Sequence, residues 1–136
     1  MRSVLGVLDS WAVLALVQGE RAAAEVETRM ARACEAGPPL LMSTVNAGEV
    51  WYQIARQHST AGADELVARL QRIGIEFVPA GWDLTRIAAD FKARFRLAYA
   101  DCFAAALAKL HGTELLTGDP EFRQLGKEVS IRWLPR

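Results

Sequence analysis

Residues 4–17 read VLGVLDSWAVLALV, and this stretch sets the pattern for the rest of the chain. Its first part, Val4 to Leu8, is a short uncharged run that favours a buried β-strand, and the run from Trp11 to Val17 favours a helix. Asp9 stands between them, at the carboxyl end of the expected strand. The stretch therefore predicts a strand, an acidic residue and a helix, in that order.

The same alternation continues along the sequence. Short apolar runs predict strands at residues 40–42, 75–78, 114–117 and 131–134. Helical spacing, caps and stop residues predict helices at residues 20–35, 44–57, 63–72, 83–94 and 98–110. Strands that alternate with helices are typical of a mainly parallel sheet with helices on both faces. We therefore expect a three-layer α/β/α fold with a four- or five-stranded sheet.

Length and composition favour one domain that spans residues 1–136. With 51% hydrophobic and 24% charged residues, the chain has the composition of an ordinary globular protein with a packed core. The apolar runs are too short to cross a bilayer, and Asp9 interrupts the run that would form the core of a signal peptide. We therefore expect a cytoplasmic protein with no membrane contact.

The charges of the chain are balanced. Lys and Arg together number 16, and so do Asp and Glu. Many proteins that bind nucleic acids carry an excess of positive charge, which this chain lacks. Any affinity for a nucleic acid must therefore come from local groups of cations.

Several common kinds of functional site have no support in the sequence. Cys34 and Cys102 are expected to be buried packing residues, and His58 and His111 lack the spacing of a zinc site. No GxSxG elbow, GxxxxGK[ST] loop or GxGxxG turn occurs, which leaves serine-hydrolase and nucleotide-cofactor sites without an anchor. Core or interface positions are expected for the four tryptophans, Trp11, Trp51, Trp82 and Trp133.

Four acidic residues occupy positions where this fold would gather them. Asp9 and Asp119 each follow an expected strand, and open parallel sheets bind ligands beyond the carboxyl ends of their strands. Asp101 lies in the first turn of an expected helix, and Glu49 shares a helix face with Asn46. Each position also has a structural explanation: a cap or turn at the two strand ends, the helix dipole for Asp101, and solvent exposure for Glu49.

The surroundings of these acidic residues favour a metal site. Glu49 and Asp101 have small and apolar neighbours, among which an isolated charge is costly. Four carboxylates in one place would repel one another and raise one another's pKa unless a cation compensated them. Oxygen ligands suit a hard ion such as Mg²⁺ or Mn²⁺.

Four blocks of sequence resemble the acidic blocks of PIN-domain nucleases. The blocks are residues 7–10, 42–50, 100–105 and 116–122, and the chain is similar above all to the VapC toxins of bacterial and archaeal toxin–antitoxin pairs. The resemblance implies a PIN-like fold, endoribonuclease activity that depends on Mg²⁺ or Mn²⁺, a homodimer, and inhibition by an antitoxin of the VapB kind. One departure is at Ala98 and Tyr99, where many members carry a glycine and a serine or threonine.

The resemblance also implies roles for individual residues. The metal ligands and catalytic residues would be Asp9, Glu49, Asp101 and Asp119. Residues that support the site would be Ser10, Ser43, Thr117 and Glu121. Cations close to the acidic positions are candidates for RNA binding, namely Arg94, Arg96 and Arg123.

Two other functions remain open from the sequence. A PIN-like fold that binds an antitoxin or RNA without cutting is one alternative, although all four acidic positions are intact. A phosphatase of the haloacid-dehalogenase kind is the other, but it needs an aspartate where this chain has Trp11. Trp11, Leu14 and Trp51 are expected to contribute to an antitoxin groove or a dimer contact, and core burial explains them equally well.

Overall fold

The structure is a computed structural model that describes residues 3–136, without the side chain of Ala36. Its centre is a five-stranded sheet in which all neighbouring strands are parallel, in the order β3-β2-β1-β4-β5. The strands are β1 (Gly6–Leu8), β2 (Leu40–Ser43), β3 (Ile75–Val78), β4 (Leu115–Thr117) and β5 (Ile131–Trp133).

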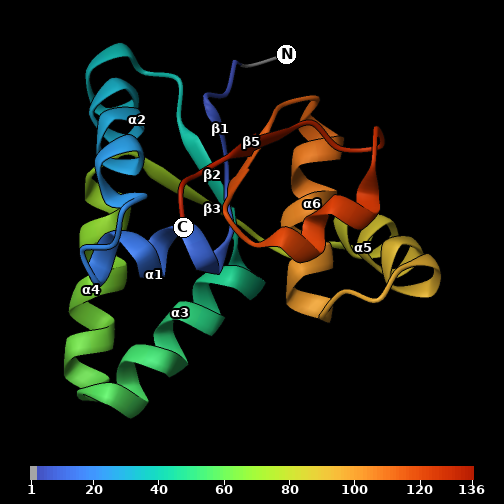
Figure 1. The fold of residues 1–136 in the computed structure, drawn as a ribbon. Helices are drawn as coiled ribbons and strands as arrows, with labels where there is room; N and C mark the ends of the chain where they lie inside the picture. Colours follow the sequence, from blue (N-terminus) through green and yellow to red (C-terminus); the bar gives the residue numbers. More distant parts are fainter. Residues whose placement is uncertain (1–2) are drawn as a thin grey trace.

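Helices cover both faces of this sheet (Figure 1). One face carries α1 (Ser10–Val17), α2 (Ala23–Ala36), α3 (Thr44–Gln57) and α4 (Thr60–Arg72). The other face carries α5 (Trp82–Arg94) and α6 (Tyr99–His111), with a short 3-10 helix, η1 (Pro120–Leu125), beside them. The expected three-layer α/β/α fold is therefore confirmed. No helix within residues 3–136 is long and apolar enough to cross a membrane.

The sheet separates two hydrophobic cores. Successive residues of β1 point to opposite faces, so Val7 belongs to the core under α5 and α6, and Leu8 to the core under α1–α4. Every side chain from Cys102 to Ala108 of α6 is buried. Because most of them are small, α6 packs close to the sheet, and its first turn is held firmly at the sheet's edge.

The boundaries of several elements differ from the predicted ones. The first strand begins at Gly6 rather than Val4, and α2 begins at Ala23 rather than residue 20. Helix α4 begins at Thr60 rather than residue 63, because the Ser59 hydroxyl caps it by accepting a hydrogen bond from the N–H of Gly62 at 2.9 Å.

A helical element after Asp119 was not predicted. The sequence indicated only a turn at residues 118–120, whereas the structure forms η1 there. Asp119 accepts a hydrogen bond from the N–H of Glu121 at 3.0 Å, and Pro120 suits the first position of a helix because it needs no donor there. This short helix turns the side chain of Glu121 towards the acidic residues.

Two expectations about buried residues were wrong in part. Cys102 is buried, but Cys34 is exposed, because the buried stripe of α2 runs through Val26, Met30 and Ala33 and leaves the next position outside. Trp82 is 71% exposed and Trp133 is 43% exposed, so neither lies in the core of this chain, and an interface position for them stays a prediction. Trp82 begins α5, whose core contacts come from later positions of the helix, namely Leu84, Ala88 and Phe91.

Candidate active site

The order of the strands creates a crevice at one edge of the sheet. The chain runs outward from β1 through β2 to β3, and then returns to place β4 on the other side of β1. Ligands of open parallel sheets bind where the strand order reverses in this way, beyond the carboxyl ends of the strands. Asp9 follows β1 and Asp119 lies two residues after β4, and the first turns of α1, α3 and α6 converge there (Figure 1).

Asp9 is both a helix cap and a member of this crevice. It is 1% exposed, and its Oδ1 accepts a hydrogen bond from the N–H of Ala12 at 2.8 Å, which caps α1. Its Oδ2 accepts a hydrogen bond from the Thr117 hydroxyl at 2.6 Å. That hydroxyl in turn accepts a hydrogen bond from the N–H of Asp119 at 3.1 Å. The two strand ends are thereby joined through one threonine.

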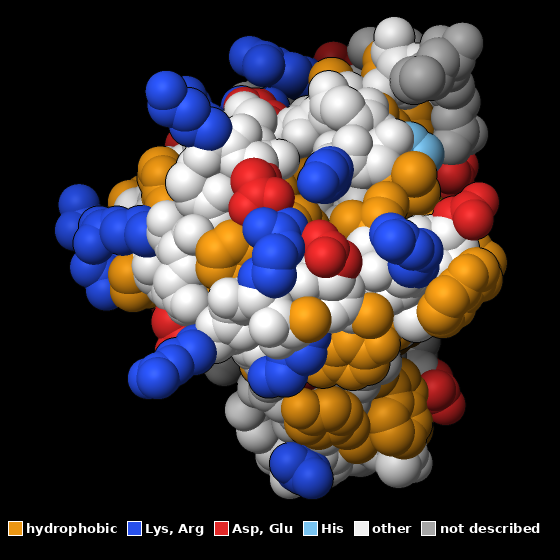
Figure 2. Space-filling view, turned by 90° about the vertical axis from the view of Figure 1, so that its right-hand side faces the viewer, with side chains coloured by type: hydrophobic (Ala, Val, Ile, Leu, Met, Phe, Trp, Pro, Cys, Tyr) orange, Lys and Arg blue, Asp and Glu red, His pale blue; other side chains and the backbone are white. Residues whose placement is uncertain are grey.

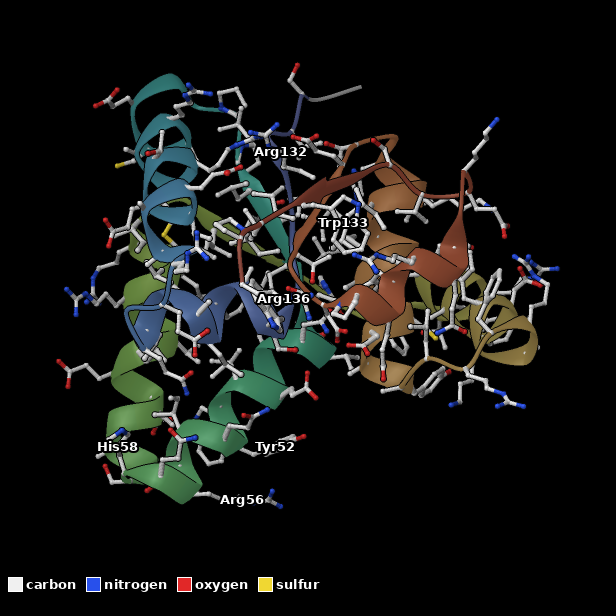
Figure 3. The ribbon with its side chains drawn as sticks, in the orientation of Figure 1. Tyr52, Arg56, His58, Arg132, Trp133 and Arg136 are labelled. Carbon is white, nitrogen blue, oxygen red and sulfur yellow. The ribbon has the colours of Figure 1, made fainter. Side chains whose placement is uncertain are left out.

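Glu49 enters the crevice from α3. The Ser10 hydroxyl donates a hydrogen bond to its Oε1, and the Tyr52 hydroxyl lies 3.5 Å from its Oε2. Tyr52 and Arg56 project from the side of α3 that faces away from α4 (Figure 3), with the Arg56 guanidinium 4.8 Å from the Tyr52 ring centre. Glu49 is therefore held in place by residues of two helices.

Three carboxylates come close enough to share one cation. Carboxylate oxygens of Asp101, Asp119 and Glu121 all lie within 4.8 Å of one another. Asp101 comes from the first turn of α6, whereas Asp119 and Glu121 come from the start of η1. Asp9 and Glu49 are not members of this trio, and their oxygens accept hydrogen bonds from Thr117, Ala12 and Ser10.

The carboxylates nevertheless share one electrostatic environment. Burial, with smaller contributions from the charges of Asp101 and Asp119, raises the pKa of Asp9 to about 7, although the hydrogen bonds from Thr117 and Ala12 act to lower it. Burial also raises the pKa of Asp101 to about 7, helped by the charges of Asp119, Glu49 and Glu121. The crevice therefore disfavours negative charge unless a proton or a cation accompanies it.

Asn46 is a residue of the crevice that the sequence did not single out as functional. Its amide nitrogen donates to the backbone oxygen of Ala100, next to Asp101, at 2.9 Å. Its Oδ1 is buried and has no hydrogen-bond partner among the described residues. An amide on the same apolar helix face as Glu49, three residues earlier, was the only signal in the sequence.

The donor set of the crevice fits a hard divalent cation. Three carboxylates stand within reach of one ion, a buried amide oxygen lacks a partner close by, and no nitrogen or sulfur ligand belongs to the trio. Oxygen ligands of this kind suit Mg²⁺ or Mn²⁺ better than zinc. The pKa of Asp101 is raised by burial and also because the negative charges of Asp119 and Glu121 lie close to it, and a bound cation would offset that repulsion.

Ser43 and Trp11 contact segments that lead to the crevice, namely the start of α3 and the turn at Gly118. Ser43 is buried at the end of β2 and caps α3 by accepting a hydrogen bond from the N–H of Val45 at 3.0 Å. A Cβ atom added to Gly118 would lie 2.3 Å from the Trp11 ring, so the turn that leads to Asp119 rests directly on this indole. Trp11, Leu14 and Trp51 are partly buried against the core of the α1–α4 face.

The three arginines near the acidic residues have different surroundings. Arg94 forms ion pairs of 2.8 Å with both Asp90 and Glu128. Arg96 is tied to η1 through its backbone, because its N–H donates to Gln124 Oε1 at 2.9 Å, and its guanidinium has no acidic partner among residues 3–136. The Arg123 guanidinium lies 5.8 Å from the centre of the Trp133 ring. Arg94 is thus neutralised locally, whereas the other two remain available to an anion.

Comparison with known proteins agrees with this architecture. The sequence model of the PIN domain matches residues 6–128. No curated protein matches the chain at a significant level. Among solved structures, VapBC2 from Rickettsia felis, bound to a promoter DNA fragment, has a TM-score of 0.74 at 12% identity, over 97% of this chain and 100% of that one.

Two further solved structures are similar. VapBC from Salmonella typhimurium, bound to DNA, has a TM-score of 0.73 at 13% identity, over 95% of this chain and 97% of that one. The toxin VapC20 from Mycobacterium tuberculosis, described as cleaving the sarcin-ricin loop, has a TM-score of 0.66 at 20% identity, over 92% of this chain and 98% of that one. At these identities the similarity establishes the fold.

Proposed function

The chain belongs to the PIN-domain family, and we propose that it is a metal-dependent endoribonuclease that acts as the toxin of a toxin–antitoxin pair. The observation that carries this proposal is the trio of Asp101, Asp119 and Glu121, whose oxygens lie within 4.8 Å of one another at the crevice where the strand order reverses. The match to the PIN-domain family gives no support to a phosphatase of the haloacid-dehalogenase kind.

Asp101, Asp119 and Glu121 would hold Mg²⁺ or Mn²⁺ directly, with Asp9 and Glu49 beside them as further ligands or as acceptors for bound water. When bound, such an ion acidifies a water molecule and stabilises the charge that develops on a phosphodiester during hydrolysis. Asn46 would add a neutral oxygen through its unpartnered Oδ1.

The chain's own residues would keep the carboxylates in place. Thr117 and the N–H of Ala12 fix both oxygens of Asp9, and Ser10 fixes one oxygen of Glu49. Side chains locked in this way position a reaction more precisely than mobile ones. Asp9 and Asp101, whose pKa values are raised to about 7, would exchange their protons for the charge of the cation.

RNA would be held by local cations rather than by a general positive field. Figure 2 shows basic and acidic side chains interspersed on the face that lies to the right in Figure 1. Arg123 precedes Gln124 in η1, and the Gln124 side chain is hydrogen-bonded to the backbone of Arg96 in the loop before α6. Arg94 would steady that region through Asp90 and Glu128 rather than bind RNA.

A VapB-like antitoxin would be the partner of this chain, and a homodimer its assembly. Similar solved structures are VapBC complexes from Rickettsia felis and Salmonella typhimurium, and the similarity spans nearly the whole of each chain. The partly buried Trp11, Leu14 and Trp51 would contribute to one of these contacts.

Cleavage of RNA by Asp101→Asn and Asp83→Asn variants tests the function. Asp83 is an exposed aspartate in the first turn of α5, as Asp101 is in the first turn of α6, so it is a matched control outside the crevice. With Mg²⁺ or Mn²⁺, the parent and Asp83→Asn should cleave RNA, and Asp101→Asn should not. Equal cleavage by Asp101→Asn would overturn the proposal, and a parent that binds the ions but never cleaves would favour the binding-only alternative.

A further inference from the structure

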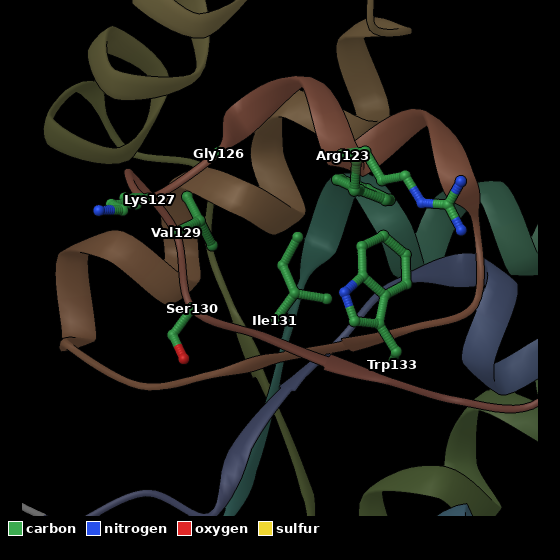
Figure 4. Close-up of a pocket in the computed structure, with 8 residues that line it drawn as sticks. Arg123, Gly126, Lys127, Val129, Ser130, Ile131 and Trp133 are labelled. Carbon is green, nitrogen blue, oxygen red and sulfur yellow. The ribbon is translucent and has the colours of Figure 1, made fainter.

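A pocket lies between η1 and β5. Its volume is about 490 Å³, within the range of small-ligand pockets. Figure 4 shows Arg123 and Trp133 side by side at one end of this pocket and Lys127 at the other, with Ser130 and Ile131 between them. We refer to it as the Trp133 pocket. It has the two features that single-stranded nucleic acids require, an aromatic surface and positive charge.

The Trp133 side chain is partly exposed, with the Arg123 guanidinium 5.8 Å from the centre of its ring. It is 43% exposed, and its indole N–H has no hydrogen-bond partner among the described residues. The indole N–H of Trp51, by contrast, donates to Asp64 at 2.9 Å. Large aromatic side chains usually bury most of their surface, and an exposed one in a pocket offers a flat apolar face to a ligand.

The cations of the pocket are also free of acidic partners. Arg29, Arg94 and Arg132 form ion pairs with glutamate or aspartate. Arg123 and Lys127 are exposed, and no acidic residue within the part of the chain that the structure describes neutralises them. In a chain whose charges balance, these two unpaired cations make the pocket a local site for phosphate.

The two elements that form the pocket also carry residues of the acidic crevice or pair with them. Trp133 pairs with Thr117 in the β4–β5 register, and the N–H of Leu134 donates to the Thr117 oxygen at 2.9 Å. Thr117 is the residue that holds Asp9. Arg123 lies two residues after Glu121 on η1. In Figure 3, Trp133 accordingly lies next to η1, over the strands that lead to the crevice.

We propose that the Trp133 pocket binds one unpaired nucleotide of the RNA substrate next to the bond that is cut. The base stacks on the Trp133 indole, and Arg123 and Lys127 contact the adjoining phosphates. The inference rests on the proposed nuclease function. It specifies the substrate further, because a base reaches such a surface only when it is outside a double helix. The nucleotide that this pocket binds is therefore one that lies outside a double helix.

Nuclear magnetic resonance of the indole N–H groups tests the contact without cleavage. The full chain is kept in chelator and titrated with a short single-stranded RNA, and the Trp133 signal is identified from its absence in Trp133→Phe. The Trp133 signal should move. The signal of Trp82, which is 71% exposed at the start of α5, is the matched control and should stay in place. An unmoved Trp133 signal, or equal movement of both, would overturn the proposal.

Binding measurements on variants give a second, independent test. Trp133→Ala should weaken the affinity for single-stranded RNA about tenfold, whereas Trp133→Phe should retain most of it, because a base needs an aromatic ring to stack on. Trp133→Leu keeps apolar volume on β5 and serves if Trp133→Ala does not fold. Arg123→Gln and Lys127→Gln should weaken binding and reduce its salt dependence, and Trp82→Ala should change neither.

The outcomes separate this proposal from the proposed function. If the parent cleaves RNA and Trp133→Leu keeps its affinity for RNA, the proposal for the pocket is wrong and the proposed nuclease function is retained. If the Trp133 signal moves but the chain cleaves no RNA, RNA binding at the pocket is supported and the proposed nuclease function is wrong. A Trp133→Leu variant that loses affinity for an inhibitory protein partner but keeps its affinity for RNA would show that the pocket serves the partner, and would overturn the proposal.

Discussion

The Thr117 hydroxyl donates a hydrogen bond of 2.6 Å to Asp9, a residue 108 positions earlier in the chain, and accepts one of 3.1 Å from the N–H of Asp119. Thr117 and Asp9 are buried, and Asp119 is partly buried. A single hydroxyl therefore determines the orientation of one carboxylate and the backbone position of another.

Thr117→Val should destabilise the protein and impair its activity. Valine has nearly the same shape but no hydroxyl, so the buried Asp9 Oδ2 would lose its donor, at a cost of about 1–3 kcal/mol in the free energy of unfolding. Urea unfolding measures this cost. The control is Thr28→Val, which removes an exposed hydroxyl that donates to the Ala24 oxygen at 2.9 Å. Equal stability of the two variants would contradict the role assigned to Thr117.

The metal-free protein should lose stability as the pH rises from about 5 to about 8. The folded-state pKa values of Asp9 and Asp101 are about 7, above the ordinary 3.8, so the folded chain binds more protons than the unfolded chain in this window. Stability is therefore greatest at the acidic end and falls as these groups ionise beside Asp119, Glu49 and Glu121, by on the order of 2 kcal/mol.

Unfolding in chelator at several pH values measures this dependence. Asp90 and Glu128 do not obscure it, because Arg94 lowers the pKa of both, and their contribution is lost only at more acidic pH. Asp101→Asn should show a shallower dependence than the parent. A parent whose stability rises between pH 5 and pH 8 would show that the acidic crevice does not resist ionisation.

Without metal, Asp101→Asn should melt at the same temperature as the parent or higher. Asp101 makes no side-chain hydrogen bond within residues 3–136, so the change removes repulsion from Asp119 and Glu121 and leaves other contacts intact. Mg²⁺ or Mn²⁺ should then raise the Tm of the parent more than that of the variant, because a ligand stabilises the state that binds it. Thermal melts with chelator and with each ion give both comparisons.

The metal-site interpretation would be wrong if both Asp101→Asn and Asp119→Asn strongly destabilised the metal-free protein. Asparagine caps helices about as well as aspartate, so Asp119→Asn should keep η1 in place. A large loss in both variants would mean that the carboxylates act as structural groups.

Arg94→Gln and Arg96→Gln should affect different properties. Arg94 is engaged by Asp90 and Glu128 and lies over the rings of Phe91 and Phe95, so its loss should lower the Tm by a few degrees and leave RNA affinity unchanged. The Arg96 guanidinium is free of such partners, so its loss should weaken RNA binding and reduce the salt slope by about 1. RNA affinity measured at several salt concentrations distinguishes the two variants. A reduced salt slope in Arg94→Gln would show that Arg94 also contacts RNA.

The sequence predicted the scaffold of the site well, because that part depends on local pattern. Asp9 and Asp119 follow apolar runs that form strands, and parallel strands bring their carboxyl ends to one edge. The same pattern placed Asp101 in the first turn of a helix, where the structure has it.

The sequence did not predict which carboxylates form the close trio and which lie outside it. Glu121 joins the trio only because Asp119 and Pro120 start η1, and the pattern indicated no more than a turn there. Glu49 accepts a hydrogen bond from Ser10, 39 residues earlier, and this contact depends on the packing of α1 against α3, which no local sequence pattern predicts. The Trp133 pocket also depends on packing, since it needs η1 beside β5.

The central place of β1 in the sheet has a consequence for synthesis. Its neighbours are β2 and β4, so the first strand made by the ribosome must wait for one of the last to emerge before the sheet can close around it. A nascent chain that stalls before residue 115 presents Asp9 without Thr117, and lacks Asp119 and Glu121 altogether. Products truncated before residue 115 therefore have no assembled acidic crevice.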